Sequence, residues 1–307
     1  MKKKVLVTGC SGFIGSALCK RLIHDGYEVF GIDRKPCSFL DGVHFNQLCL
    51  NSMNRWDIPS GVEIVFHLAG KTGVRKSNID FKNYLWDNVL ATKRLLDCLP
   101  TTDVKKFIYT SSSSVYGDRG HDAPFKEEDK TNPKSPYGMT KLMAENLIQY
   151  YMDIYDMDYV ISRQHTCYGE GQRTDLAMHK FITNIKNNDI NYIYTYNDHD
   201  GYDKEMRRDY IHIDDTVQSL IDFMKRGYGI YNVANRKSYD TLDVLFKIAK
   251  ILGKKPLYEY EKSNPLWGEM RYTWGNIDRV EDEVMWHPRI SLDEGLRKQI
   301  EWMKEKK

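Results

Sequence analysis

KVLVTGCSGFIGSALCKRLIHDG, residues 4–26, decides the fold of this 307-residue chain. Its apolar, β-branched start predicts a buried strand, and the amphipathic remainder predicts a helix. Gly9, Gly12 and Gly15 lie between the two. In such a turn Gly9 permits the tight bend, Gly12 lets the backbone approach a pyrophosphate, and Gly15 lets helix and strand pack closely. The alternative is a plain glycine turn.

The next predicted strand, residues 27–33, ends at a carboxylate, Asp33. A carboxylate at this place accepts hydrogen bonds from both hydroxyls of an adenosine ribose and repels a 2′-phosphate, which favours NAD over NADP. Arg34 keeps the choice open, because an arginine beside the ribose can accept that phosphate. Asp33 is otherwise an ordinary solvated carboxylate at a strand end.

Strands alternate with helices along the chain, which predicts an α/β fold: a Rossmann-type, doubly wound parallel sheet with a smaller C-terminal substrate-binding lobe. Further strands are predicted at residues 62–70, 105–112, 157–164 and 229–235, and helices at 83–99, 135–155, 241–252 and 292–304; residues 208–224 predict a turn followed by a helix. The expected NAD-binding domain comprises residues 1–167, with 208–236 returning to it, and the expected lobe comprises residues 168–207 and 237–307.

The composition argues against several classes of protein. The net charge is +2 and no basic stripe is present, so no nucleic-acid partner is expected. The six cysteines lie far apart without a CxxC pair and the nine histidines do not cluster, which predicts no metal site and a reducing cytoplasm. No apolar run reaches the roughly 18 residues needed to span a bilayer. The start, MKKKVLVTGC, has too short an apolar run for a signal peptide, so no membrane partner is expected.

Candidate catalytic residues follow the predicted strand at residues 105–112. The run TSSSSVYG ends this strand, and SPYGMTK then places Tyr137 and Lys141 four apart on one face of a predicted helix. A tyrosine hydroxyl titrates near 10, and a neighbouring ammonium together with a positive nicotinamide lowers that pKa enough for proton transfer. A second YxxxK pattern, Tyr258 and Lys262, lies in a charged stretch and is interpreted as chance.

The whole chain resembles the extended short-chain dehydrogenase/reductases, specifically the nucleotide-sugar epimerase/dehydratase branch, and its motifs are most similar to those of UDP-glucuronate 4-epimerases. The similarity runs through GCSGFIG, HLAGKTGVRKS, TSSSSVYG, SPYGMTK, TCYGEGQRTD, RDYIHIDD and DEGLRKQIEW. It implies Ser112 as a third catalytic residue that hydrogen-bonds the reacting hydroxyl beside Tyr137. It implies NAD as the cofactor, bound by Gly9, Gly12, Phe13, Ile14, Gly15, Asp33, Arg34, Leu68, Ala69, Gly70, Tyr137 and Lys141.

The resemblance also narrows the reaction. In the family's 4,6-dehydratases, the two positions after the catalytic serine or threonine are an aspartate and a glutamate that act as acid and base, and the decarboxylases keep the glutamate. Here both positions are hydroxyls, Ser113 and Ser114. A serine near neutral pH cannot do that proton transfer unaided. The remaining reaction is 4-epimerisation.

Several positions resemble the uronate-specific members. Thr166 stands where UDP-glucose epimerases usually carry asparagine, Arg173 matches the arginine of a GQRPDM motif, and Arg75 matches that of GVRYS. With Ser113 and Ser114 they are expected to hold the sugar carboxylate, which protects a β-keto acid from losing CO₂. Arg208 matches the diphosphate arginine. The family's second one is expected near Pro265 and Leu266, so Arg271 is its candidate replacement. Glu170 and Thr174 replace prolines of the family motif.

The sequence therefore predicts an NAD-dependent 4-epimerase that converts UDP-glucuronate to UDP-galacturonate through a 4-keto intermediate. Three alternatives stay open: a 4-epimerase of UDP-glucose or a UDP-N-acetylhexosamine, an NADPH-dependent 4-keto-sugar reductase, and a non-catalytic NAD-binding sensor. The helices at 83–99 and 137–155 are the pair that this family uses for a four-helix dimer interface. A homodimer is expected, with Trp86, Tyr150, Tyr151 and Tyr155 as candidate contacts.

Overall fold

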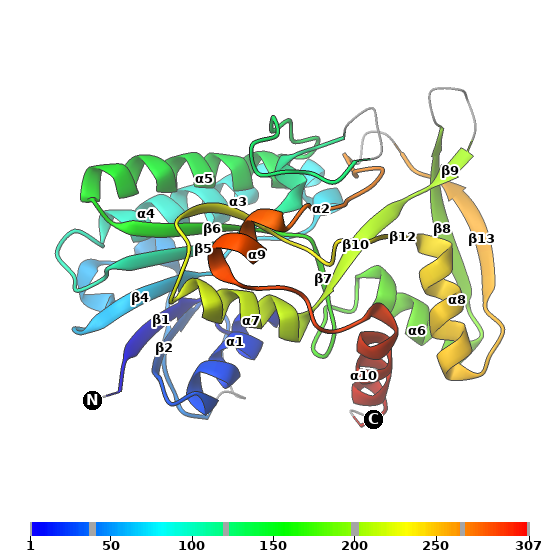
Figure 1. The fold of residues 1–307 in the computed structure, drawn as a ribbon, viewed down its shortest axis with the longest axis horizontal. Helices are drawn as coiled ribbons and strands as arrows, with labels where there is room; N and C mark the ends of the chain where they lie inside the picture. The colour runs from blue at the N-terminus through cyan, green and yellow to red at the C-terminus, as the bar shows by residue number, and fades with distance from the viewer. Residues whose placement is uncertain (1, 37–40, 119–122, 198–202, 265–267, 306–307) are drawn as a thin grey trace.

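The computed structural model describes residues 2–36, 41–118, 123–197, 203–264 and 268–305. Seven strands form a central sheet in the order β11-β6-β5-β4-β1-β2-β3 (Figure 1). All neighbouring pairs in it run parallel. The predicted Rossmann-type class is therefore confirmed. The strands are β1 (Lys4–Thr8), β2 (Glu28–Asp33), β3 (Val43–Gln47), β4 (Val62–His67), β5 (Lys106–Ser112), β6 (Asp158–Gln164) and β11 (Gly229–Val233).

Helices cover both faces of this sheet. Helices α1 (Phe13–His24) and α7 (Ile213–Phe223) lie on one face, and α4 (Ala91–Asp97) and α5 (Pro136–Tyr155) lie on the other (Figure 1). The middle of strand β1, residues 5–7, is apolar because helices cover both faces of the sheet. Val5 and Val7 pack under α1 and α7, whereas Leu6 packs under α4 and α5. A strand that is buried on both faces admits a polar side chain only with a partner, as at Thr8, whose hydroxyl hydrogen-bonds His67 at 2.8 Å.

The helix predicted at 83–99 is present over residues 81–97, with a π-helical turn in its middle. The chain forms α2 (Val74–Ile79), α3 (Phe81–Leu85), a π-helical turn η3 (Trp86–Leu90) and then α4. The buried residues of the first half of this helix are Tyr84 and Asn88. A π turn accommodates one extra residue and thereby shifts the buried face. It turns the Asn88 side chain inward, where its amide donates to the Thr140 hydroxyl at 3.0 Å.

The C-terminal lobe lies at one end of the sheet (Figure 1). One small sheet has the order β12-β10-β7 and another has the order β13-β8-β9. Residues 208–212, predicted as a turn, belong to strand β10 instead, because they pair with β7 and β12. The strands are β7 (Thr166–Tyr168), β8 (Ile190–Asn197), β9 (Asp203–Glu205), β10 (Arg207–His212), β12 (Ser238–Asp240) and β13 (Leu257–Lys262).

Helices α6, α8 and α10 of the lobe enclose a separate apolar cluster that includes Phe181, Leu245 and Leu296. The remaining elements are α6 (Ala177–Asn187), α8 (Thr241–Leu252), α9 (Asp278–Val284), α10 (Leu292–Glu305) and the 3-10 turns η1 (Leu50–Ser52), η2 (Arg55–Asp57) and η4 (Ser113–Val115). Across the described part of the chain, no helix combines the length and apolar character needed to cross a bilayer.

Candidate active site

The glycine turn after β1 has the geometry that a phosphate site requires. Gly9 has φ +74°, and a Cβ there would lie 2.6 Å from the Ala69 amide nitrogen. A Cβ on Gly15 would lie 2.1 Å from the Gly9 carbonyl oxygen, so both positions admit glycine alone. Gly12 is the N-cap of α1, and no side chain caps this end of the helix. The first-turn N–H groups, beginning at Phe13 and Ile14, are therefore available to an anion.

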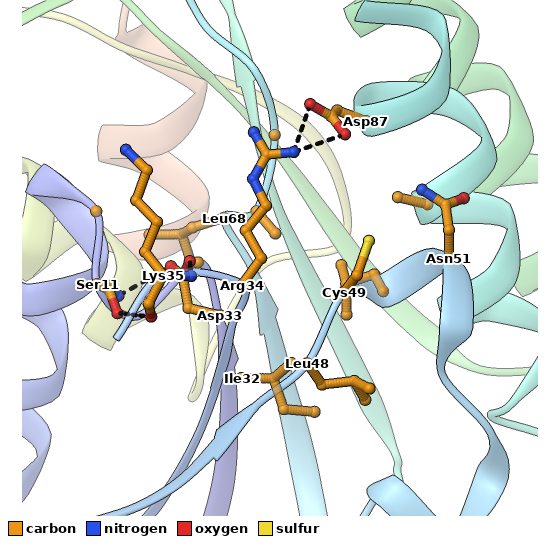
Figure 2. Close-up of a pocket in the computed structure, with 16 residues that line it drawn as sticks. Ser11, Ile32, Asp33, Arg34, Lys35, Leu48, Cys49, Asn51, Leu68 and Asp87 are labelled. Carbon is orange, nitrogen blue, oxygen red and sulfur yellow. Dashed lines mark hydrogen bonds and ion pairs between the residues drawn. The ribbon is translucent and has the colours of Figure 1, made fainter. Parts of the chain in front are cut away.

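A groove runs beside this turn, across the carboxyl ends of β1 and β2 (Figure 2). The Asp33 carboxylate lies at its edge, where Oδ2 accepts the Ser11 N–H at 3.1 Å and Oδ1 accepts the Lys35 N–H at 2.9 Å. These bonds fix the carboxylate for a diol ligand. Seven predicted cofactor residues line the groove: Gly9, Gly12, Asp33, Arg34, Leu68, Ala69 and Gly70.

Arg34 extends across the groove to a carboxylate on the opposite wall (Figure 2). Its Nη1 donates to Oδ1 and Oδ2 of Asp87, in η3, at 3.0 and 2.9 Å. The positive charge that made NADP an alternative is thus paired within the protein.

The three predicted catalytic residues come together at the end of β5. Ser112 ends this strand, and a hydrogen bond joins its hydroxyl to Tyr137. Helix α5 begins here because Ser135 caps it, accepting the Gly138 N–H at 3.1 Å, and Pro136 occupies its first position. One turn further along, Lys141 is buried and its Nζ donates to the Thr110 carbonyl at 2.8 Å.

The electrostatics of this trio differ from the simple expectation. Burial raises the pKa of Tyr137 above its usual 10, while the Ser112 hydrogen bond and the positive charge of Arg173 oppose that rise. Burial also lowers the pKa of Lys141 to about 8, and the Glu145 carboxylate opposes that change. In the protein alone, the groups that favour the Tyr137 phenolate are therefore Ser112 and Arg173.

The four serines divide between structure and site. The Ser111 hydroxyl donates to buried Glu145, while Ser112 faces Tyr137, as alternation along a strand requires. Ser114 donates its N–H to the Ser112 hydroxyl at 3.2 Å, and Ser113 is buried beside it in η4.

Sequence reasoning missed the buried ion pair that Ser111 joins. Arg163 Nη2 lies 2.8 Å from Glu145 Oε2, and its Nε lies 3.2 Å from both carboxylate oxygens. The available signal was spacing, since Glu145 continues the four-residue series of Tyr137 and Lys141.

Arg173 is the predicted substrate residue that the structure brings to Tyr137. Its charge acts on the Tyr137 hydroxyl. Its Nε and Nη2 donate to the two oxygens of Asp175 at 2.9 and 2.8 Å, and its Nη1 donates to Thr72 Oγ1. Tyr84 holds the loop of Thr72 by donating to the Thr72 and Gly73 carbonyls, each at 2.8 Å.

Arg75 is directed toward the lobe instead. Its Nε and Nη2 donate to the Glu269 carboxylate at 2.7 and 3.1 Å, and its guanidinium carbon lies 4.3 Å from the centre of the Tyr194 ring. This contact joins α2 to strand β8.

Arg208 and Arg271 form another cluster with Asp118. Arg208 Nη1 donates to the backbone carbonyls of Arg207 and Arg271 at 2.8 and 3.2 Å. Arg271 donates its N–H to Asp118 Oδ1 at 2.8 Å, and its Nε lies 3.8 Å from Oδ2. Two guanidinium groups at one place suit a diphosphate. Pro265 and Leu266 lie outside the described residues.

Two further predicted positions, Thr166 and Glu170, lie a few residues before Arg173. Thr166 belongs to β7, where it pairs with Tyr210 of β10. Glu170 lies 3.1 Å from His212 Nε2 and 4.0 Å from Lys298 Nζ, so its polar neighbours belong to the protein itself. Among the described residues, no group of three histidine, cysteine or acidic side chains is placed to hold a metal ion.

The second YxxxK pattern does not form a comparable site. Tyr258 and Lys262 lie at opposite ends of strand β13, where four residues span about 13 Å. The two side chains are therefore too far apart to act as a pair.

Comparisons with known proteins show similarity along almost the whole chain. A family model described as the NAD dependent epimerase/dehydratase family matches residues 5–234. A UDP-glucuronate 4-epimerase from Thermodesulfobacterium geofontis is 30% identical over 320 residues, covering 98% of this chain and 96% of that protein. An uncharacterized UDP-glucose epimerase from Bacillus subtilis is 31% identical over 323 residues, covering 98% of both. The solved structure of Bacillus cereus UDP-glucuronic acid 4-epimerase with UDP-glucuronic acid and NAD superimposes with a TM-score of 0.89 at 30% identity, covering 99% of this chain and 100% of that one.

Proposed function

The chain belongs to the NAD-dependent epimerase/dehydratase family, and on that premise we propose that it is a UDP-hexuronate 4-epimerase, converting UDP-glucuronate to UDP-galacturonate through a 4-keto sugar. The observation that carries the proposal is the position of Arg173. Arg173 donates to Thr72, on the loop that Tyr84 holds, and the centre of the Tyr84 ring lies 6.3 Å from that of the Tyr137 ring, so the positive charge of Arg173 favours the Tyr137 phenolate. The carboxyl group of a hexuronate is attached to C5, next to the C4 hydroxyl that reacts, so a cation beside Tyr137 is where that carboxylate needs one.

The groove beside the glycine turn fits NAD. Asp33 is fixed to receive the adenosine ribose hydroxyls, and the uncapped N-terminus of α1 suits the pyrophosphate. Because Asp87 pairs with Arg34, a 2′-phosphate meets a compensated cation there and the Asp33 carboxylate beside it. NAD held there by Asp33 and the N-terminus of α1 would supply reversible hydride transfer at C4 of the sugar.

The residues at the end of β5 handle the proton of the C4 hydroxyl. Tyr137 takes this proton, with Ser112 hydrogen-bonded to the phenol and Arg173 favouring its ionised form. Lys141, held on the Thr110 carbonyl, adds positive charge to the same end of α5. We propose Ser113 and Ser114 as hydroxyl donors to the sugar; neither can act as the acid or base that dehydration requires.

We propose Arg208 and Arg271 as diphosphate residues and Thr166 as a neighbour of the sugar carboxylate. We also propose Arg75 as a substrate residue, whose guanidinium already pairs with Glu269. Arg75 therefore offers a substrate little net charge, and its expected part is to hold α2 against the lobe.

A second candidate is a 4-epimerase of a neutral sugar such as UDP-glucose. The observation in its favour is that both arginines of the predicted carboxylate site, Arg75 and Arg173, are paired with acidic side chains in the protein. The similarity to an uncharacterized UDP-glucose epimerase points the same way.

The deciding experiment incubates the purified protein with UDP-glucuronate and follows the anomeric proton signals by NMR, without added cofactor and then with NAD⁺. Formation of UDP-galacturonate supports the proposal. If UDP-glucuronate does not react while UDP-glucose or UDP-N-acetylglucosamine does in parallel tubes, the protein is a 4-epimerase of a neutral sugar instead. Release of a UDP-pentose would mean that the sugar has lost CO₂, and would contradict the proposal that the site holds the carboxylate and prevents this loss.

Controls address the other two alternatives. A 4-keto-sugar reductase consumes NADPH in proportion to its product, whereas an epimerase consumes none. An NAD-binding sensor binds NAD without turnover. Tyr137→Phe keeps NAD binding and abolishes turnover if the tyrosine transfers the proton.

We also propose a homodimer in which a second copy covers the outer face of α3, η3, α4 and α5. This face exposes Trp86 (49%), Leu90 (40%), Tyr150 (62%) and Ile154 (59%). Neighbouring exposed apolar side chains of this size suit an interface between copies. Tyr151 contributes less, because it is partly buried and donates to Asp97 at 2.9 Å. Tyr155 is partly buried as well. Sedimentation of wild type and Tyr150→Glu tests the proposal.

We propose the cytoplasm as the compartment of the protein, on the spacing of its cysteines alone.

A further inference from the structure

The guanidinium of Arg173 already holds a carboxylate. Nε and Nη2 each donate one hydrogen bond to Asp175, at 2.9 and 2.8 Å, and Nη1 donates to Thr72. Two parallel N–H···O bonds are the arrangement in which an arginine binds any carboxylate tightly. The edge of Arg173 that a sugar carboxylate would use is therefore occupied by a side chain of the protein.

Asp175 has a second cation within reach. Lys76, on α2, places its Nζ 3.3 Å from Asp175 Oδ2, the same oxygen that Arg173 Nη2 binds. The Asp175 side chain is 37% exposed and that of Lys76 is 70% exposed, so neither is locked by packing. Arg173 and Lys76 together lower the pKa of Asp175 to about 2, which keeps it ionised at neutral pH.

We propose that Asp175 is a specificity-determining residue that occupies Arg173 in the free enzyme and yields it to the carboxylate of a uronate substrate, moving onto Lys76. The inference rests on the proposed function. Exchange of one carboxylate for another conserves charge around Arg173, so its cost is low for a uronate. A neutral hexose offers no replacement, and Arg173 stays paired with Asp175.

The alternative is that Asp175 stays bound to Arg173 and assists uronate binding. If the sugar carboxylate binds the outer N–H groups of Nη1 and Nη2, Asp175 stays in place and only orients the guanidinium. Removing the Asp175 charge then weakens uronate binding, whereas removing a competitor strengthens it. The sign of the effect separates the two arrangements.

The experiment measures binding by calorimetry with the NAD-loaded Tyr137→Phe protein, in which turnover is blocked. UDP-glucuronate and UDP-glucose are titrated in parallel, with and without Asp175→Asn. We expect Asp175→Asn to tighten UDP-glucuronate by about two- to fivefold, the range for a partly exposed ion pair. UDP-glucose affinity stays unchanged. A damaged loop would instead weaken both ligands together.

Lys76→Gln provides a variant of opposite sign, because it removes the cation that receives Asp175. It is expected to weaken UDP-glucuronate relative to UDP-glucose, while Lys82→Gln, an equal charge change at an exposed site on α3, leaves that ratio unchanged.

The outcomes distinguish the two hypotheses. If the protein prefers UDP-glucuronate and Asp175→Asn weakens that preference or leaves it unaltered, the exchange is wrong and the proposed function stands. If the protein binds UDP-glucose and not UDP-glucuronate, the proposed function fails and the exchange fails with it.

Discussion

Replacing Glu145 by glutamine tests whether the buried ion pair beneath the serine run supports the fold. Glu145 is fully buried, the Arg163 side chain is 4% exposed, and three contacts of 2.8 to 3.2 Å join them. Glutamine keeps the shape but leaves the Arg163 charge uncompensated. Removing one partner of a buried pair costs about 3–5 kcal/mol. Since native proteins are stable by only about 5–15 kcal/mol, Glu145→Gln is expected to lose a large fraction of the free energy of unfolding.

The assay is urea unfolding at a fixed NAD concentration, followed by circular dichroism and tryptophan fluorescence. The matched control is Glu128→Gln, the same change at an exposed site, which is expected to stay within about 0.5 kcal/mol of wild type. Glu145→Leu combined with Arg163→Met removes both charges and should recover stability. If Glu145→Gln loses no more than the control, the reasoning about this pair is refuted.

The same variant has a second, kinetic consequence. Burial lowers the pKa of Lys141 to about 8, and the Glu145 charge limits that decrease. A lysine is charged below its pKa, so activity that needs the ammonium falls as the pH rises through this value. Without the Glu145 charge, the pKa falls further and the alkaline limb of kcat moves to lower pH. If the alkaline limb of kcat lies at the same pH in Glu145→Gln and wild type between pH 6 and 9, the charge of Glu145 does not act on Lys141.

Three further predictions concern other parts of the chain. Asp87→Asn frees Arg34 and should raise the affinity for NADPH relative to NADH in fluorescence titrations; an unchanged ratio argues that Asp87 does not restrain Arg34. Gly15→Ala places a Cβ 2.1 Å from the Gly9 carbonyl and should abolish NAD binding in calorimetry; retained binding means the turn can relax. Burial lowers the pKa of His165 to about 3, so below pH 6.5 the unfolded chain binds the proton and wild type loses stability. Relative to wild type, the free energy of unfolding of His165→Leu should rise by about 1.4 kcal/mol for each pH unit below 6.5. Urea midpoints that change equally with pH in both proteins would contradict this.

The glycine turn and the pairing of Tyr137 with Lys141 were predictable because each depends on residues that are close together in the sequence. Gly9, Gly12 and Gly15 lie within one turn, and Tyr137 and Lys141 lie one helical turn apart. Alternation along β5 even determines which serines face the same way. The sequence could not show that the Ser111 hydroxyl meets Glu145, because that contact depends on how α5 packs against the sheet.

The charged contacts were not predictable, because their partners are distant in the chain. Arg34 meets Asp87, and Arg75 meets Glu269, through the packing of separate elements. Strand β13 was overlooked for a related reason. Tyr258 and Tyr260 alternate with Glu259 and Glu261, but this pattern is short, every residue of the strand is exposed, and its pairing partner β8 is distant in the chain.

The place of β11 at the edge of the central sheet has a consequence for biosynthesis. Strand β6 pairs with β5 on one side and with β11 on the other, yet residues 165–228 separate β6 from β11 in the chain. A ribosome adding roughly 5–20 residues per second needs several seconds to make that interval. During this time the nascent sheet presents the apolar edge of β6 without a neighbour, a known hazard for aggregation. The last strand to join the sheet thus sets how long the edge of β6 stays unpaired in the emerging chain.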